Sequence, residues 1–475
     1  MRRMHEVLTG SRDEAGMSLV EVIVAMFVFA IVSSGVIYGM LSVITLSRDS
    51  RAREVAANLA AQEIDLARDT EDLFDLLDKD VDKTISNDKF HVQVRTQWVT
   101  DPNNDIVCGA GGSALRYKRV NVSVTWDGKR AATEPVRADT VIQPESKIND
   151  PTKGTILVSV LGAAGTGVGG VSVSAAPSSV PNGATSLTVA PAPTDAQGCS
   201  YVLKVTPGTY DVTVSRASHV DTAQATTSKV TVGVTAGTSA AASFQYDAAG
   251  TFTVNYAGDY VPAAGEVVRV PANPTTTFLS TYGAHVLDPG AATSRSRTVK
   301  LHPFSGGYQV FAGSCKAADP EEWPDSTNAT GQPITGTRPA GVAAAAGGTA
   351  TANVPMGVVK LALGSSGTQR YLRAVSATSP VPGSGDPGCV TPAPATAVTY
   401  TFGSAAGYGI PADGLLTVAL PYGSWRLYSG TGATVSSWTT AVAAGQMSLP
   451  AAPVPARSSI DPSGIVTFDP RVVTP

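Results

Sequence analysis

The chain has 475 residues and a formal net charge of −4, and 15% of its residues are charged. A chain of this length should hold several domains. Its small net charge gives no support to nucleic-acid binding, or to attraction to an anionic membrane surface, through a global electrostatic field. Of the 72 charged residues, 41 lie in positions 1–150, and the remaining 325 positions are rich in Ala, Gly, Thr, Ser, Val and Pro. Recurrent V-x-V-x-V patterns with Tyr and Phe there favour extracellular-type β-sandwiches over helices or low-complexity disorder.

The first predicted element is an apolar helix that is long enough to span a membrane. Between Met17 and Ser47 every residue is apolar, small or hydroxylic except Glu21. This run of about 30 residues exceeds the roughly 20 helical residues that cross a bilayer core. A cleavable secretory signal has a shorter apolar stretch followed by its cleavage site, whereas the plausible processing signal here, Ala15-Gly16, precedes the run.

The helical pattern continues beyond the apolar run, because residues 47–77 contain no Gly or Pro. At 100° per residue, one arc collects apolar side chains and is interrupted only by Glu63. The arc holds Ala52, Val55, Ala56, Leu59, Ala60, Leu66 and Ala67, and the residues off it are Arg51, Arg53, Glu54, Asn58, Asp65 and Arg68. This pattern predicts an amphipathic stalk that packs on its own domain. Packing of the same stripe on identical or related helices is compatible with that interpretation.

The start of the apolar run resembles the class III leader of type IV prepilins and pseudopilins. The matching residues are Gly16, followed by Met17-Ser18-Leu19-Val20-Glu21 and the apolar segment 22–46. The resemblance implies that residues 1–16 are a leader and that prepilin peptidase cleaves after Gly16 and N-methylates Met17. It also implies a role for Glu21 in subunit assembly. The chain departs from the family pattern in having Met rather than the commoner Phe as first mature residue, and in a leader that is less basic than usual.

Glu21 is a lone carboxylate in an apolar run, which is costly in hydrocarbon. Cleavage after Gly16 would create an α-amino group four residues before it. In a filament of packed apolar helices, the Glu21 carboxylate could pair with the terminal ammonium of a neighbouring subunit and fix its register. The alternative is a carboxyl group that stays protonated in lipid or reaches the interface.

After a helix over residues 17–70, we expect a small α+β head at 71–150. Its clearest strands are residues 89–99 and 117–126, and in the second of these Val120, Val122, Val124 and Trp126 alternate with polar residues. A long helix followed by a short antiparallel sheet is what a pilin head requires.

An internal repeat organises the rest of the chain. A Gly that starts an alternating strand recurs at Gly154, Gly250, Gly357 and Gly464, and a Gly-x-aromatic-x-aliphatic element recurs at 207–212, 305–310 and 422–427. We expect Tyr210, Tyr308 and Trp425 of this second element to point inward. The repeat predicts three β-sandwich modules at 151–247, 248–355 and 356–450, followed by a Pro-rich tail at 451–475 whose last strand completes an earlier sheet. The modules resemble prealbumin-like or carboxypeptidase-regulatory-like domains, and the stretch TDAQGC…TPGTYDVTV resembles them most. The fold class is α+β.

Four cysteines allow three connectivities if all of them pair. Proximity in sequence favours Cys315–Cys389 and Cys108–Cys199, and free thiols are the alternative. No C-x2-C motif or His cluster points to a metal, and nothing predicts a cofactor. The five histidines are scattered, and G-x-S-x-G and P-loop motifs are absent. The G-x-G-x-x-G match at 383–388 lies in a Pro/Gly loop without strand-to-helix context, so we interpret it as chance.

Two functional classes therefore remain for a chain that we do not expect to be an enzyme. The first is a minor, tip-associated structural subunit of a type IV pilus, which displays its β-modules to an unknown surface ligand. The second is a type II secretion-like pseudopilin, or a membrane-anchored adhesin that never enters a filament. Both begin as single-pass membrane proteins with extracytoplasmic modules. The expected partners are prepilin peptidase and other pilin subunits, and no nucleic acid is indicated.

The position of Gly16 predicts a mature protein that begins at Met17. The variant Gly16→Val should stay unprocessed in the membrane, because the residue before the scissile bond no longer fits the motif. Mass spectrometry of the mature N-terminus measures this directly. An assembled form that retains residues 2–16 would contradict the processing hypothesis.

Overall fold

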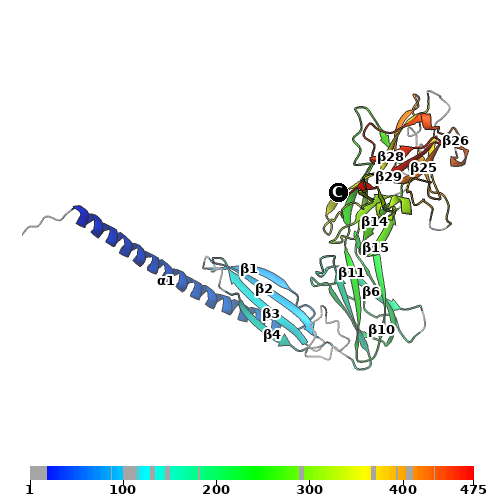
Figure 1. Ribbon diagram of the computed structural model, residues 1–475. Coiled ribbons are helices and arrows are strands. Elements are labelled where there is room, and N and C mark those ends of the chain that lie inside the picture. The colour runs from blue at the N-terminus through cyan, green and yellow to red at the C-terminus, as the bar shows by residue number, and fades with distance from the viewer. Residues whose placement is uncertain are drawn as a thin grey trace, which may run out of the picture. The chain divides into compact units, whose positions relative to one another are not determined.

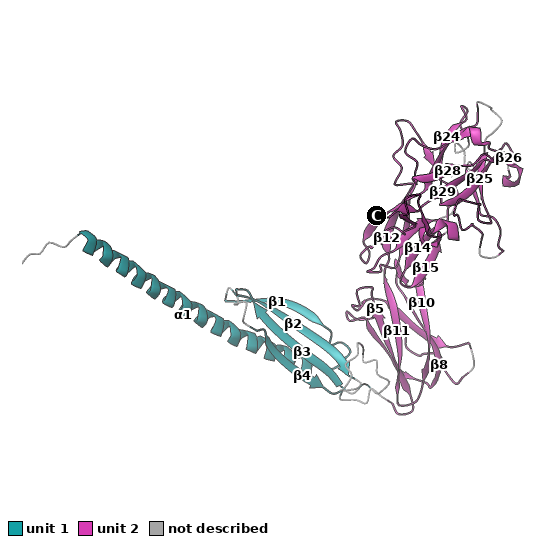
Figure 2. Cartoon of the chain, in the orientation of Figure 1, with its two compact units in different colours: residues 1–102, 115–147 teal, residues 103–114, 148–475 magenta. Residues whose placement is uncertain are grey.

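The computed structural model describes residues 19–86, 88–99, 108, 115, 117–128, 134–144, 150–179, 182–287, 294–364, 371–391, 394–402, 410–432 and 434–474. The chain forms two compact units, one comprising residues 1–102 and 115–147 and the other residues 103–114 and 148–475 (Figure 2). The first unit contains the long helix and a small sheet, and the second contains the β-modules (Figure 1). The expected α+β fold class is confirmed.

Helix α1 spans Leu19–Arg68. It ends at Arg68, although the sequence has no Gly or Pro before position 77. The residues that follow explain this end, because carboxylates at a helix C-terminus oppose the helix dipole. Asp69, Glu71 and Asp72 lie there, and the Asp72 side chain accepts a hydrogen bond from the backbone N–H of Phe74 at 2.9 Å. An Asx turn thus replaces the next helical turn.

The head sheet is an antiparallel meander in the order β1-β2-β3-β4. Its strands are β1 (Lys79–Ile85), β2 (Asp88–Val99), β3 (Tyr117–Trp126) and β4 (Val136–Ile142). The two strands predicted from alternation are β2 and β3. The pattern did not predict the two edge strands, because they are short and polar and bury little of their own surface.

The first β-module is a sandwich of two sheets, with the orders β10-β8-β6 and β7-β5-β11-β9. The side chains between the sheets form one core that runs from Ile156 to Tyr246. Strand β5 pairs with β11 in parallel and with β7 antiparallel. The strand bounds are β5 (Gly154–Leu161), β6 (Ser172–Pro177), β7 (Cys199–Val205), β8 (Gly208–Ser215), β9 (His219–Asp221), β10 (Thr227–Val234) and β11 (Ser239–Ala248).

The second β-module also has two sheets, β16-β12-β20 and β15-β14-β17, around a core centred on Phe252, Phe278 and Tyr308. These three rings pack edge to face, with centroids 5.3–6.4 Å apart. The strand bounds are β12 (Gly250–Tyr256), β14 (Thr276–Ser280), β15 (Gly283–Leu287), β16 (Ser296–Leu301), β17 (Gln309–Ala312) and β20 (Thr349–Val354).

The third β-module packs a sheet of order β13-β24-β21-β27 on a larger sheet of order β23-β22-β25-β29-β28, in which β26 also pairs with β25. A smaller sheet, β18-β19-β30, adjoins them. The strand bounds are β13 (Val268–Arg269), β18 (Ser326–Thr327), β19 (Pro333–Thr335), β21 (Gly357–Ala362), β22 (Tyr371–Ser376), β23 (Thr399–Phe402), β24 (Leu415–Leu420), β25 (Gly423–Gly430), β26 (Thr440–Ala441), β27 (Met447–Ser448), β28 (Arg457–Ile460), β29 (Ile465–Asp469) and β30 (Val472–Val473). Single 3-10 turns occur at Lys316–Ala318, Pro320–Glu322, Val435–Ser437 and Ala444–Gln446.

The sequence repeat corresponds to equivalent positions in the modules. Gly154, Gly250 and Gly357 each begin a strand, and the strand after Gly464 pairs with β25 of the third module. Tyr210, Tyr308 and Trp425 are fully buried, as the alternation predicted. Each also donates a hydrogen bond from its side chain to a backbone carbonyl four to six residues upstream, on Thr206, His302 and Pro421 respectively. The repeated aromatic residue therefore pins the turn that precedes its strand, much as a tyrosine corner does.

The first residue of β21 has no room for a side chain. A Cβ built on Gly357 would lie 1.9 Å from the Phe468 ring. Gly357→Ala should therefore destabilise the third module by about 1–3 kcal/mol or more, the usual range for overpacking a core. The measurement is the thermal midpoint of the purified chain. Gly233→Ala, in β10, is the control, because its Cβ would meet no atom within 4 Å. Equal midpoints for the two variants would contradict the packing argument.

Candidate assembly surface

Glu21 lies in the first turn of α1 as the structure describes it, and its side chain is exposed. Gly16 and Met17, the predicted cleavage and methylation positions, lie outside the described residues. The structure therefore places the predicted assembly residue on an exposed part of a helix.

The apolar part of α1 is exposed along its length. Large apolar side chains from Leu19 to Leu46 remain uncovered, with Phe29 74% exposed and Tyr38 81% exposed. At 1.5 Å per residue this stretch is about 42 Å long, which exceeds the roughly 30 Å of a bilayer core. The helix is thus long and apolar enough to cross a membrane. A surface of this size requires either lipid or other apolar helices around it.

Beyond the apolar part, α1 lies on the head sheet through a stripe of small and aliphatic side chains. The buried set is Ala52, Ala56, Leu59, Ala60, Ile64 and Ala67, and it packs on inward residues of β2 and β3 such as Phe90 and Val122. Two details differ from the sequence-based prediction. Leu66 is 51% exposed, because it lies on the flank of the helix beside the exposed Gln62, whereas Ile64 is buried.

Glu63 also differs from its sequence-based interpretation, since it is 3% exposed rather than an interruption of the packed face. Its carboxylate forms an ion pair with Lys79 Nζ at 2.5 Å and accepts a hydrogen bond from Lys83 Nζ at 2.9 Å, and both lysines belong to β1. Burial alone would raise the pKa of Glu63, but the hydrogen bonds and charges of the two lysines outweigh burial and lower it. The pair of lysines therefore holds the polar edge strand β1 against the helix. No local pattern could have revealed this, because the partners are 16 and 20 residues away.

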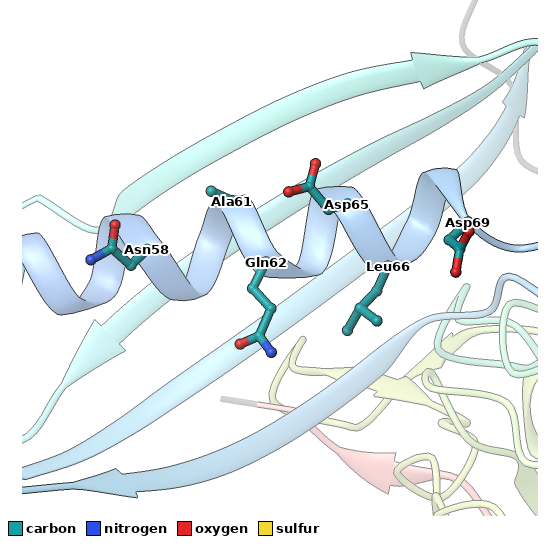
Figure 3. A pocket seen from close by; sticks show the side chains of 6 residues that line it. All are labelled: Asn58, Ala61, Gln62, Asp65, Leu66 and Asp69. Atoms are coloured by element: carbon teal, nitrogen blue, oxygen red, sulfur yellow. The ribbon is translucent and has the colours of Figure 1, made fainter.

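The opposite side of α1 is an exposed stripe of polar and small residues. Asn58, Ala61, Gln62, Asp65, Leu66 and Asp69 line a shallow groove along the helix (Figure 3). The Asp65 side chain is 79% exposed, and its ion pair with Arg68 is long, at 3.8 Å. Since the head covers only the other side of α1, this stripe extends the exposed helix surface from the apolar part along the head.

The cysteines form two disulfides, Cys108–Cys199 and Cys315–Cys389. These are the pairs that proximity in sequence favours. Cys108 belongs to residues 103–114, which lie between β2 and β3 in sequence but are part of the second unit. Among the described residues, no group of three or more His, Cys, Asp or Glu side chains is placed to hold a metal ion.

A family model for the prokaryotic N-terminal methylation motif matches residues 11–37. This range contains Gly16, Met17 and Glu21 and continues into the exposed apolar helix. The chain carries a prepilin-type N-terminal segment. No curated protein matches the chain.

Among solved structures, the chain is similar to the Bacillus anthracis TIE protein, with 10% identity, a TM-score of 0.19, and coverage of 75% of this chain and 68% of that one. It is also similar to a Streptococcal ancillary pilin, with 10% identity, a TM-score of 0.19, and coverage of 41% and 66%. BcpA, the major pilin subunit of Bacillus cereus, has 11% identity, a TM-score of 0.18, and coverage of 66% and 95%. Because these TM-scores are low, the three structures give no indication of what this chain does.

The buried Glu63 should make the stability of the head depend on pH. A lowered pKa means that the contribution of Glu63 is present above the ordinary carboxyl pKa of about 4.3 and is lost as the pH falls through the folded-state value. At pH 7, Glu63→Gln should cost about 1–3 kcal/mol, because both lysines lose their charged partner. The deficit should shrink at pH 3, and thermal unfolding followed by circular dichroism measures both.

The control is Asp65→Asn on the exposed side of the same helix, which should change stability by no more than about 0.5 kcal/mol at either pH. A deficit for Glu63→Gln that is equal at pH 7 and pH 3 would mean that packing, and not the ion pairs, holds β1.

Proposed function

We propose that this protein is a low-copy structural subunit of a type IV pilus, located at or near the tip, which displays its β-modules for contact with a surface. The observation that carries the proposal is the continuity of three features on one helix. The prepilin-type segment leads into an exposed apolar stretch, and the same helix then buries one side on a small antiparallel sheet. This is the arrangement that an assembling pilin requires.

In this proposal the helix exchanges one apolar environment for another. Before assembly, α1 crosses the cell membrane once, with the head and modules outside the cytoplasm. Prepilin peptidase cleaves after Gly16 and methylates Met17. The apolar surface between Leu19 and Leu46 then leaves lipid and packs on the helices of other pilin subunits, so that the exchange costs little hydrophobic free energy.

Glu21 supplies the specificity that apolar packing lacks. A carboxylate surrounded by apolar helices is strongly unfavourable unless a cation meets it. The N-terminal ammonium at Met17 of a neighbouring subunit is such a cation, and it exists only after cleavage. Pairing therefore rewards processed subunits in one register, as a buried polar residue does in a coiled coil.

The β-modules argue for low copy number. The second compact unit contains most of the chain, and repeating it at every position of a thin filament would crowd the surface. A terminal position leaves the modules room to project. Their sequence is rich in small and hydroxylic residues and poor in charged ones, which favours display and adhesion over enzymatic activity. Immunogold labelling of sheared filaments tests the location, and gold on membranes alone would favour the anchored adhesin or the secretion-type pseudopilin.

Substitution of Glu21 separates assembly from membrane insertion. Glu21→Ala should insert at least as well as the wild type, because a carboxylate leaves an apolar segment, and cleavage after Gly16 should persist. Incorporation into filaments should fall because the neighbouring ammonium loses its partner. The measurement is the ratio of filament-associated to membrane-associated protein.

Glu21→Gln is the matched variant, since it keeps the shape and a hydrogen-bond acceptor but not the charge. A defect nearly as deep as that of Glu21→Ala would identify the charge as the important property. Incorporation of Glu21→Ala at the wild-type ratio would overturn the pairing mechanism.

A further inference from the structure

The junction between the first and second β-modules contains a buried histidine that the proposed function does not use. His302 follows β16 of the second module and is 1% exposed. Neither ring nitrogen has a hydrogen-bond partner within the described part of the chain. A buried polar group without a partner is costly, and in a native structure it calls for an explanation.

The backbone of His302 lies at the centre of the contact between the two modules. Its N–H donates to Gln224 Oε1 of the first module at 2.7 Å, and its carbonyl accepts Tyr308 Oη at 2.8 Å. Gln224 Nε2 in turn donates to Tyr308 Oη at 3.0 Å. Gln224 itself has a left-handed backbone, with φ of 68°, in the turn between β9 and β10. Three residues thus form a closed hydrogen-bonded clasp across the junction.

The groups around the imidazole keep it neutral while the clasp is closed. Its ring packs on Phe304, with the centroids 4.7 Å apart. Burial lowers the pKa of His302, and the carboxylates of Asp247 on β11 and Asp221 on β9 offset this only in part. Both carboxylates already accept backbone N–H groups, Asp247 from Ala163 and Asp221 from Ala223 and Ala225. The Tyr308 hydroxyl, which donates a hydrogen bond to the His302 carbonyl, is also titratable, and it stays neutral because burial raises its pKa.

We propose that this junction is an acid-responsive hinge, which opens when His302 takes up a proton and moves its ring into water. The direction of the pH effect follows from the different proton affinities of the open and closed forms. The open form, with its ring in water, binds a proton below about pH 6.5, whereas the closed form resists it. As the pH falls from the pKa of His302 in the open form to its lower pKa in the closed form, the ratio of open to closed molecules should therefore rise by up to about tenfold per pH unit. The proposal does not depend on filament assembly, because it concerns two modules of one chain.

Spin-label distances on the full chain in detergent micelles test the hinge. The native cysteines are paired in two disulfides, so labels at Ala236→Cys and Ala264→Cys, both exposed alanines, report on the first and second module respectively. The distance distribution should be narrow at pH 7.5 and should broaden or shift at pH 5. His302→Phe should remain narrow at pH 5, because its ring cannot be protonated.

Three further variants make the result decisive. The distance distribution of Gln224→Ala should be broad at both pH values, because this substitution breaks the clasp whether or not His302 is protonated. His91→Asn, in the head, should respond to pH as the wild type does. His302→Gln replaces His302→Phe if the phenyl ring disturbs packing at pH 7.5, and it should be as insensitive to pH. A wild-type distribution that is unchanged at pH 5, or a pH response that persists without His302, would overturn the proposal.

Discussion

The apolar part of α1 is the constraint on which the rest of the molecule depends. Among the described residues, the large apolar side chains between Leu19 and Leu46 remain exposed. Leaving them in water is unfavourable, relative to an apolar environment, by an amount that grows with their area, so the folded protein requires lipid or other apolar helices around this segment. Hydrophobic attraction alone does not choose among such environments, because lipid tails and apolar side chains are nearly equivalent. In the proposed function, Glu21 at the start of the segment makes that choice.

The same helix then has to serve as part of a folded head without closing off its other side. Alanines at positions 52, 56 and 60 allow the helix to lie close to the sheet, and they leave little apolar surface to hold it there. The Glu63 carboxylate and the two lysines of β1 add the attachment that small side chains cannot supply. Their cost is a desolvated charge, which is tolerable because the lysine ammonium groups remain partly in water. The head is thus bound to one side of α1, and the groove near Asp65 stays open.

Periodicity predicted the elements whose own residues alternate. Strands β2 and β3, the repeated Gly-strands and the buried residues Tyr210, Tyr308 and Trp425 follow from local pattern and from the repeat. The edge strands β1 and β4 could not be predicted from local pattern, because their position depends on partners far along the chain. Glu63 was misread for the same reason, because one sequence shows a carboxylate but not the lysines that meet it. Of the candidate site, the N-terminal motif could be recognised as a short contiguous string, whereas the Gln224–His302–Tyr308 clasp joins residues that no spacing brings together.

The β-modules differ in how firmly they are joined, and this difference locates any bending within the second unit. Strand β13, which follows the second module's β12 in sequence, pairs with β24 in a sheet of the third module. The Asn273 side chain donates a hydrogen bond to the Thr399 carbonyl and accepts one from the Thr401 N–H, both in β23. The C-terminal strands are attached to the third module by the pairing of β29 with β25 and by Arg471, which donates hydrogen bonds to the Ser384 carbonyl at 3.0 Å and the Pro324 carbonyl at 2.7 Å. Modules that share a sheet cannot rotate against each other without breaking ladder hydrogen bonds, so the second and third modules move together.

The first module meets the second through the Gln224 clasp and short backbone contacts such as Gly347 N–H to Ala248 O. A clasp of this kind can release without unfolding either sandwich. Of the two junctions, the one that contains His302 is therefore the one that can open without breaking a shared sheet.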